Sequence, residues 1–297
     1  MIQQTTVRVP ASTSNLGPGF DCLGVALRIY NDIIVTRGEK WQPLLVARQT
    51  ADLFFKRAGQ QPFSFSCSIK ERILRARGLG SSATIRLGVL HGLNELSGRP
   101  LDRLSIFKLC AELEGHPDNA APASFGGFTV ARGENVQCFA VSPRLFFVLL
   151  IPDLEIRTSA ARTILPARIT RAAAVQNCSN ACAITAAFAS RRYENLRGNF
   201  VDQLHQPFRK KLMPFLPDVI ASAEKAGALG AFLSGSGSSI CAITLQYRHK
   251  VAAAMLRVVS PSLGRTRLLA GSTSARTLIT TADNRGVRLH HSRVTDH

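Results

Sequence analysis

The sequence predicts an α+β protein, because segments with strand-like and helix-like patterns follow one another along the chain. Residues 5–9 alternate polar and apolar side chains, as a half-buried strand does. Residues 82–96 instead place their apolar side chains at the spacing of an amphipathic helix. The run from Leu145 to Ile151 is apolar throughout, which is typical of a strand buried on both faces.

The remaining elements fit the same mixed class. Further strands are expected over 29–35 and 63–69, within FGGFTV at 125–130, and near 230–235 and 240–245. Further helices are expected over 101–114, 170–190 and 216–227, the last capped by Asp218 or the residues just before it. Pro143 lies between two predicted strands. It is therefore the best candidate boundary between a domain of residues 1–143 and one of residues 144–297.

The chain carries a large excess of positive charge. It has 37 Lys and Arg residues against 19 Asp and Glu residues, which gives a net charge of +18. Such a balance favours polyanions and raises nucleic acid as a partner. The Arg-rich end of the chain, however, lacks the interleaved aromatic residues on which bases stack. Its basic residues are Arg265, Arg267, Arg276, Arg285, Arg288 and Arg293. We therefore expect a basic surface without a nucleic-acid partner.

No pattern in the sequence predicts export or membrane insertion. The apolar run at 145–151 is far too short to span a bilayer. The first residues, MIQQTTVRVP, lack the charged segment and apolar core of a secretory signal. The seven cysteines form no CxxC pair, so neither a disulfide framework nor a zinc site is expected. A reducing cytoplasm is the expected location.

The most informative segment is a glycine- and serine-rich loop before the helix predicted at 82–96. It consists of Arg77, Gly78, Leu79, Gly80, Ser81, Ser82 and Ala83. The two glycines let the backbone turn tightly and approach a ligand closely. Ser81 and Ser82 are expected to cap the helix, whose first amides are unpaired. Free amides and the positive end of a helix dipole form a seat for phosphate, and a hydroxyl group there can also reach a magnesium ion.

Two other phosphate-binding motifs are excluded for this loop. It is not a Walker loop, because Gly-Lys-Ser/Thr occurs nowhere in the sequence. The loose dinucleotide fingerprint is present in form, but the preceding residues 70–77 are basic and do not read as a buried strand. A glycine-rich turn that binds nothing remains the plain structural alternative.

Four segments together resemble the homoserine kinases of the GHMP kinase superfamily. PASTSNLGPGFDCLGVAL at 10–27 resembles their N-terminal signature, and RGLGSSA resembles the phosphate loop of the superfamily. EGHPDNAAPASFGG at 114–127 resembles the segment that follows their metal-binding helix. GAFLSGSGSSICAI at 230–243 is similar to the C-terminal glycine-rich motif of the superfamily. The order and spacing of these segments match the family over nearly the whole chain.

This resemblance implies both a fold and an activity. The fold is an N-terminal α+β domain with a left-handed βαβ crossover, followed by a ferredoxin-like C-terminal domain. The activity is the ATP- and Mg²⁺-dependent phosphorylation of the side-chain hydroxyl of L-homoserine to O-phospho-L-homoserine, in threonine biosynthesis. Members commonly form homodimers. In the glycine-rich motif, Gly235 and Gly237 are expected at the nucleotide.

The resemblance also implies which residues hold an amino-acid substrate. They are Asn15, Asp21, His116, Asn119, Thr158, Arg162 and Arg209. Asp21 is the natural partner for the substrate ammonium group. Arg162 and Arg209 are suited to the carboxylate, since a guanidinium binds a carboxylate with a bidentate geometry that Lys does not reproduce.

The metal ligands and the catalytic base are less clearly specified. Ser82 is the expected hydroxyl ligand of Mg²⁺, and the helix ending AELEG offers two carboxylates. Helical periodicity does not choose between them, whereas the spacing in the family favours Glu112 and leaves Glu114 as the alternative. Asp118 and Asp21 are candidate bases. A loose phosphoryl-transfer transition state needs little early proton removal, so orientation is expected to contribute more than base catalysis.

Two other functions remain open from sequence alone. The chain could be a kinase for another small alcohol, such as threonine or mevalonate. Mevalonate has no ammonium group, so Asp21 would lose its partner. A second alternative is a decayed kinase that binds nucleic acid through its basic surface. The intact glycine loop, serines and substrate arginines argue against it.

Overall fold

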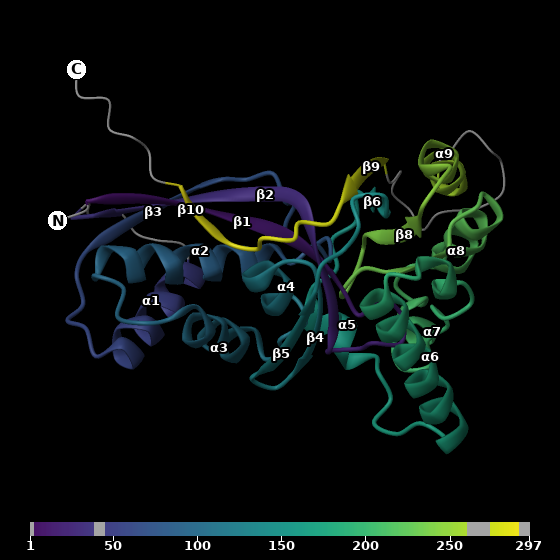
Figure 1. The fold of residues 1–297 in the computed structure, drawn as a ribbon, viewed down its shortest axis with the longest axis horizontal. Coiled ribbons are helices and arrows are strands. Elements are labelled where there is room, and N and C mark those ends of the chain that lie inside the picture. The colour runs from purple at the N-terminus through teal and green to yellow at the C-terminus, as the bar shows by residue number, and fades with distance from the viewer. Residues whose placement is uncertain (1–2, 39–44, 260–273, 291–297) are drawn as a thin grey trace.

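A computed structural model describes residues 3–38, 45–259 and 274–290 of the chain, and every structural statement below concerns these residues. They form two β-sheets that lie side by side, with helices packed against each (Figure 1). Three of the basic residues noted near the C-terminus, Arg265, Arg267 and Arg293, lie outside the described residues.

The first sheet is built on two long antiparallel strands. Its strands are β1 (Gln4–Ser14), β2 (Leu23–Arg37), β3 (Phe65–Lys70), β4 (Phe128–Arg132), β5 (Asn135–Phe139) and β10 (Arg288–His290). The order is β10-β1-β2-β4-β5, and β3 pairs with β2 beyond the end of β4. The alternation predicted for residues 5–9 is confirmed, because Thr5, Val7 and Val9 are buried while Thr6 and Arg8 between them are partly exposed.

Four helices lie on one face of this sheet (Figure 1). They are α1 (Leu45–Ala58), α2 (Ser81–Leu96), α3 (Arg103–Glu114) and α4 (Ala120–Phe125). Helix α2 comes very close to β2 through its glycines: a Cβ atom on Gly88 would lie 2.5 Å from the Ile33 side chain, and one on Gly92 would lie 2.4 Å from Val35. These contacts fix α2, and therefore the phosphate loop at its start, against the central strand.

The second sheet has the ferredoxin-like βαββαβ topology that the family resemblance implied. Its elements are β6 (Phe146–Pro152), α8 (Leu216–Lys225), β7 (Gly230–Leu233), β8 (Ile240–Thr244), α9 (Arg248–Val259) and β9 (Ala275–Thr281). The strand order is β7-β8-β6-β9, and all three pairings are antiparallel. The apolar run predicted as a buried strand is β6, and its residues from Phe147 to Ile151 are all buried.

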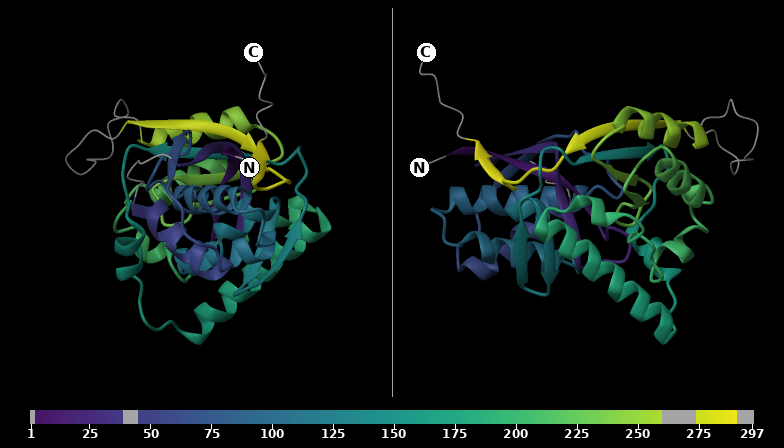
Figure 2. Two further views of the ribbon diagram at one scale, coloured as in Figure 1. Left: turned by 90° about the vertical axis from the view of Figure 1, so that its left-hand side faces the viewer. Right: turned by 45° about the vertical axis from the view of Figure 1, so that its right-hand side comes forward.

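A helical insertion between β6 and α8 supplies part of the cavity described below. It contains α5 (Thr158–Thr163), α6 (Arg171–Ser190), the 3-10 helix η1 (Tyr193–Leu196) and α7 (Gln206–Arg209). Figure 2 shows α6 extending away from the two sheets along much of its length. The C-terminal end of α6 is packed, since Phe188 stacks on Phe128 of β4 with ring centroids 4.2 Å apart.

The two sheets are joined by a common core and by the chain itself. One buried cluster contains Val25 and Phe128 from the first sheet together with Phe147 and Ile243 from the second. After β9 the chain returns to the first sheet, where β10 pairs with β1. The candidate boundary at Pro143 falls between β5 and β6, but the return of β10 means that residues 144–297 do not all lie with the second sheet.

The predicted helices and strands are present, and the sequence analysis missed several others. Those missed are α1, α4, α5, α7, α9, η1, β5, β9 and β10. The predicted cap of the helix at 216–227 is wrong in detail: Asp218 lies in the first turn of α8, and Phe215 occupies the N-cap without a side-chain hydrogen bond. The handedness of the predicted βαβ crossover stays a prediction.

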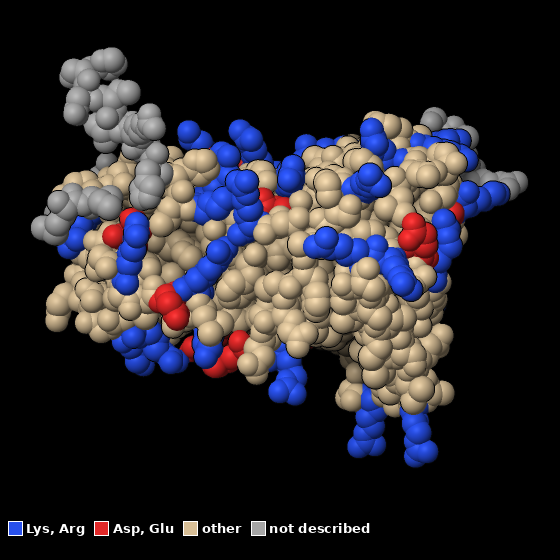
Figure 3. Space-filling model, in the orientation of Figure 1, with Lys and Arg blue, Asp and Glu red and all other residues tan. Residues whose placement is uncertain are grey.

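None of the helices in the described part of the chain is long and apolar enough to cross a membrane. The surface view in Figure 3 shows Lys and Arg side chains over several separate parts of one face, with Asp and Glu side chains between some of them. That distribution agrees with the spread of basic residues along the sequence.

Candidate active site

A cavity of about 510 Å³ opens between the phosphate loop and the insertion after β6. Segments far apart in the sequence meet there, from the β1–β2 loop, the start of α2, the end of α3, α5, α7 and the β7–β8 turn. The lining residues that the sequence analysis named are Asn15, Asp21, Arg77, Gly78, Leu79, Gly80, Ser81, Ser82, Glu114, His116, Asp118, Asn119, Thr158, Arg162, Arg209 and Gly235.

The phosphate loop needs its glycines for both conformation and space. Gly78 and Gly80 have φ values of 68° and 70°, in the left-handed region. A Cβ atom on Gly78 would lie 2.1 Å from the carbonyl oxygen of Ser234, and one on Gly80 would lie 2.2 Å from Ser12 Oγ. The loop is therefore in close contact with β1 on one side and the β7–β8 turn on the other.

The glycine-rich β7–β8 turn forms hydrogen bonds to the phosphate loop and to β1. Ser234 Oγ donates to the carbonyl of Gly78 at 2.6 Å and lies 2.8 Å from Thr13 Oγ1. Gly235 lines the cavity, and its amide donates to the carbonyl of Ser14. The Gly237 amide instead donates to the carbonyl of Ser234, and Gly237 is not among the residues that line the cavity.

The serines at the start of α2 do not cap it with their side chains. Gly80 is the N-cap, and no side-chain hydrogen bond is made there. Ser81 Oγ is buried and, within the described residues, has no hydrogen-bond partner. Ser82 Oγ donates to Glu114 at 2.7 Å. The first amides of α2 are thus left for a ligand, and one buried hydroxyl beside them is left unpaired.

Other members of the loop serve its packing. Leu79 is buried but lines the cavity, whereas Ala83 is fully buried in the core and does not line it. The Arg77 guanidinium lines the cavity but also forms ion pairs with Asp153 at 2.9 Å and Glu155 at 3.4 Å, both of which follow β6. Its side chain therefore ties the phosphate loop to the second sheet, which the sequence analysis did not anticipate.

The two carboxylates considered as metal ligands lie in different surroundings. Glu112 is exposed, pairs with Arg57 at 3.1 Å and lines a different cavity, of about 520 Å³. Glu114 accepts the hydrogen bond from Ser82 and pairs with Arg86 at 2.7 Å. Two positions along an α-helix turn a side chain by about 200°, so only one of these carboxylates can face the start of α2. That carboxylate is Glu114.

His116, Asp118 and Asn119 form a connected polar group at the back of the cavity. His116 Nδ1 lies 2.7 Å from Asp118 Oδ1, and Asp118 is 2% exposed. Asn119 accepts from Ser12 Oγ at 2.8 Å and donates to Ser14 Oγ at 3.0 Å. The structure therefore brings these predicted residues together and fixes them against β1.

The contact between His116 and Asp118 shifts the pKa of both side chains. Burial disfavours the charged form of His116, but the hydrogen bond and the negative charge of Asp118 outweigh it and raise the pKa of His116. Burial likewise opposes ionisation of Asp118, yet the hydrogen bond and charge of His116 lower its pKa. Asp118 is held as a carboxylate, which makes it a weak base.

Asn15 shapes the loop that carries Asp21. Both residues have positive φ values, 72° and 59°, a conformation that the local hydrogen bonds must hold. Asn15 Oδ1 accepts from the amide of Asp21, and Asn15 Nδ2 donates to the carbonyl of Gly235. Asn15 is 2% exposed, and its side chain holds the loop that carries Asp21 against the β7–β8 turn.

Asp21 and Arg162, which the sequence analysis assigned to opposite ends of a substrate, are paired with each other. The contact is bidentate, with Nη1 to Oδ2 at 3.1 Å and Nη2 to Oδ1 at 2.6 Å. Arg209 lies beside this pair, and both guanidinium groups lie 5.4 Å from the ring centre of Phe20. Burial and then the charge of Arg162 lower the pKa of Arg209 to about 10, so Arg209 remains charged at neutral pH.

Thr158 stands at the mouth of the cavity. It is exposed at the start of α5, and its Oγ1 lies 3.4 Å from Ser236 Oγ in the β7–β8 turn. Ser236 was not predicted as a site residue, although it lies between Gly235 and Gly237 in the motif.

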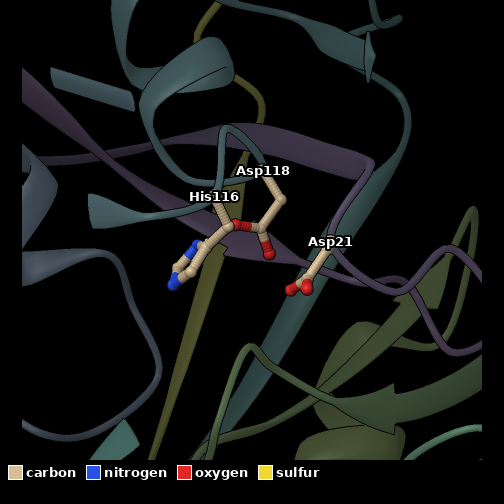
Figure 4. Close-up of side chains that lie close together, drawn as sticks. All are labelled: Asp21, His116 and Asp118. Carbon is tan, nitrogen blue, oxygen red and sulfur yellow. The ribbon is translucent and has the colours of Figure 1, made fainter. Parts of the chain in front are cut away.

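Figure 4 shows Asp21, His116 and Asp118 converging from two loops. Their ligand atoms lie within 4.8 Å of one another, a spacing that suits a cation. Each carboxylate already has a partner, since Asp118 binds His116 and Asp21 binds Arg162. A cation at this point would have to replace Arg162 on Asp21, and a substrate ammonium group is such a cation.

Sequence reasoning missed Phe20, Ser234 and His205 as parts of the site. His205 is the buried N-cap residue of α7, four residues before Arg209, and its Nδ1 lies 3.2 Å from Arg209 Nη1. That spacing places two side chains on one face of a helix, which is the signal that would have found it. Phe20 and Ser234 stand inside segments that the family resemblance already covers.

Comparisons with known proteins identify the family of this chain. Residues 45–127 match the GHMP kinases N terminal domain, and residues 184–260 match the GHMP kinases C terminal. A homoserine kinase of Carboxydothermus hydrogenoformans is 37% identical over 255 residues, covering 80% of this chain and 84% of that relative. This chain belongs to the homoserine kinase family of GHMP kinases. A second family member, from Caldicellulosiruptor bescii, is 40% identical over 256 residues, 80% of this chain and 83% of its own length.

Solved structures show the same family fold. The homoserine kinase from Cytophaga hutchinsonii superposes with a TM-score of 0.86 at 23% identity and covers 98% of both chains. A mevalonate kinase superposes with a TM-score of 0.69 at 14% identity, covering 94% of this chain and 99% of its own. The two-domain architecture is therefore that of the GHMP kinases, and the substrate has to be argued from the site.

Proposed function

We propose that this member of the homoserine kinase family transfers the γ-phosphoryl group of ATP to the side-chain hydroxyl of L-homoserine, giving O-phospho-L-homoserine. The observation that carries the proposal is the pairing of Asp21 with Arg162, beside Arg209, in the cavity that contains the phosphate loop. One acidic and two basic side chains are the set that recognises the ammonium and carboxylate groups of an amino acid.

An amino acid would enter by exchanging ion pairs. Its ammonium group would take the place of Arg162 on Asp21, while its carboxylate would bind Arg162 and Arg209. The exchange replaces one existing pair by two new ones, so no charge is left without a partner. An alcohol that lacks an ammonium group would leave Asp21 unpaired or still bound to Arg162. This argument favours homoserine over mevalonate.

The residues present also fit a nucleotide and a magnesium ion. The first amides of α2 suit phosphate oxygens, and so does the buried Ser81 Oγ, which has no hydrogen-bond partner in the described part of the chain. Ser82 and Glu114, held together at 2.7 Å, are a hydroxyl and a carboxylate of the kind that binds Mg²⁺. The ion, when bound, would neutralise charge on the transferred phosphate. The protein would hold the acceptor hydroxyl in line with the γ-phosphate of ATP, and this positioning is the larger part of catalysis in this reaction class.

A general base is not required by this arrangement. Asp118 lines the cavity, but its pKa is lowered by His116 and it is 2% exposed. We infer that Asp118 and His116 orient the substrate. A loss of kcat alone in Asp118→Asn would contradict this. We place the enzyme in the cytoplasm, where ATP and free amino acids are available.

The decisive experiment is a coupled ADP-release assay with homoserine, threonine and mevalonate as separate acceptors. We expect turnover with homoserine and a large loss of kcat/KM in Arg162→Met. Arg168→Met is the matched control, since Arg168 is exposed in the segment after α5 and does not line the cavity. Preferred turnover of threonine or mevalonate would reassign the substrate. Absence of any turnover together with salt-dependent binding of nucleic acid would instead support a non-catalytic role.

A further inference from the structure

The Arg209 guanidinium is held so that one part of it remains for a ligand. A guanidinium has five N–H groups, one on Nε and two on each Nη. In Arg209, Nε donates to the carbonyl of Ala161 at 3.2 Å. Nη1 donates to the carbonyl of Gly235 at 2.9 Å and to His205 Nδ1 at 3.2 Å. No hydrogen-bond partner of Nη2 is found within the described residues, and Arg209 lines the cavity.

The proton positions on His205 follow from these contacts. Arg209 has only donors, so His205 Nδ1 must be the unprotonated acceptor. The ring proton is then on Nε2, which lies 2.9 Å from the carbonyl oxygen of Gly17 and 3.4 Å from an oxygen of Asp202. Burial lowers the pKa of His205 to about 4, so the ring is neutral at neutral pH, in agreement with this tautomer.

His205 is itself fixed from two sides. Its ring stacks on Phe20, with centroids 5.2 Å apart and planes inclined by 28°. Asp202 accepts the backbone amides of His205 and Gln206 at the start of α7. The β1–β2 loop, through Gly17 and Phe20, and α7, through Asp202, therefore hold the imidazole in one orientation.

We propose that His205 is a positioning residue: its neutral Nδ1 holds Nη1 of Arg209 so that Nη2 points to the carboxylate of the amino-acid substrate. This inference rests on the proposed function and adds a residue that orients the group binding the substrate carboxylate. Without the Nδ1 acceptor, one N–H group of the buried Arg209 guanidinium would have no hydrogen-bond partner. The guanidinium would then rotate toward another acceptor. Arg209 would then be present but misdirected.

Two isosteric substitutions separate this role from a purely structural one. In His205→Asn the side-chain oxygen can occupy the place of Nδ1 and accept from Arg209, while the bond to Gly17 is lost. In His205→Gln the side-chain nitrogen can occupy the place of Nε2 and keep the bond to Gly17, while the acceptor for Arg209 is lost. We would measure KM for homoserine, KM for ATP and the thermal unfolding temperature of both variants and of the wild type.

We expect the two His205 variants to differ in KM for homoserine. His205→Gln should raise KM for homoserine about tenfold with KM for ATP unchanged, whereas His205→Asn should retain most of the affinity for homoserine. Homoserine without its carboxylate group is an aminopropanol whose amino group and hydroxyl group lie at opposite ends of the carbon chain. With this amino alcohol as the acceptor, His205→Gln should leave kcat/KM at the wild-type value. A double variant His205→Gln, Arg209→Lys should be little worse than Arg209→Lys alone, because His205 acts through Arg209.

Other outcomes distinguish the two hypotheses. If wild type turns over homoserine but both His205 variants raise KM equally, or phosphorylate the amino alcohol less efficiently in parallel, the positioning role is overturned and the kinase assignment stands. Equal loss of unfolding temperature with unchanged KM would also overturn it, since it would show a role in folding alone. If the wild type phosphorylates neither acceptor, the proposed function itself fails, and the inference with it.

Discussion

Glu112 and Glu114 illustrate how residues two positions apart acquire different roles. Glu114 is largely buried between Ser82 and Arg86, and Glu112 is half-exposed beside Arg57. We predict that Glu114→Gln raises the Mg²⁺ concentration needed for half-maximal activity by about 10–100-fold, because a ligand carboxylate is lost. Activity titrated with MgCl₂ at saturating ATP measures this.

Glu112→Gln is the matched control on the same helix. Its ion pair with Arg57 is exposed, so its loss should change the free energy of unfolding by less than about 1 kcal/mol. The Mg²⁺ dependence should stay at the wild-type value. An equal shift in both variants would show that neither carboxylate binds the ion directly.

The His116–Asp118 pair predicts a dependence of stability on pH. The pKa of His116 is raised in the folded protein above its ordinary value of about 6.5, so the pair stabilises the fold fully below that value. The stabilisation is lost as pH rises through the higher, folded value. Asp118, whose pKa is lowered, stays ionised throughout.

We therefore expect the difference in unfolding free energy between wild type and His116→Gln to be about 1–2 kcal/mol larger at pH 6 than at pH 9. Urea unfolding at both pH values measures it. A difference that does not change with pH, or that grows as pH rises, would contradict the assigned ion pair.

At the scale of elements, the phosphate loop is defined by its close contact with the β7–β8 turn. Gly78→Ala would place a Cβ atom 2.1 Å from the carbonyl of Ser234, at a φ value of 68°. The loop would have to move, and we expect kcat/KM for ATP to fall by at least about tenfold. Steady-state kinetics with ATP as the varied substrate measures the loss.

Gly59→Ala is the control that separates the effect of backbone strain from the effect of the close contact at Gly78. Gly59 has a similar φ value of 61°, but no atom of the residues that the structure describes lies within 4 Å of a Cβ atom placed there. It should lower stability by about 1–2 kcal/mol and leave kcat/KM for ATP unchanged. A comparable loss of activity in both variants would mean that stability, and not the seating of the loop, limits ATP use.

At the scale of the whole molecule, the two sheets share buried side chains. Phe188 of α6 stacks on Phe128 of the first sheet and belongs to the same buried cluster as Phe147 of the second. We predict that Phe188→Ala lowers the free energy of unfolding by about 3–5 kcal/mol and that wild type unfolds in a single transition. Urea unfolding followed by far-UV circular dichroism and by limited proteolysis tests both. Two separate transitions in wild type would show that the two sheets, each with the helices packed against it, are stable independently.

The sequence by itself determined the kinds of elements and the family. Alternation revealed β1, helical spacing revealed α2, and the glycine-rich segments revealed the phosphate loop and the β7–β8 turn. These features depend on local backbone geometry, which repeats along the chain and is therefore visible without any knowledge of the fold. Short or exposed elements such as β5 and β10 lack that periodicity, and the sequence analysis missed them.

Only the tertiary structure decided which side chains meet. It placed Glu114 and not Glu112 beside Ser82, paired Asp21 with Arg162, turned Arg77 toward Asp153 and placed His205 behind Arg209. Each of these contacts but the last joins residues that are distant in the chain. Their energies depend on burial and on the partners that packing provides, and periodicity carries no information about either.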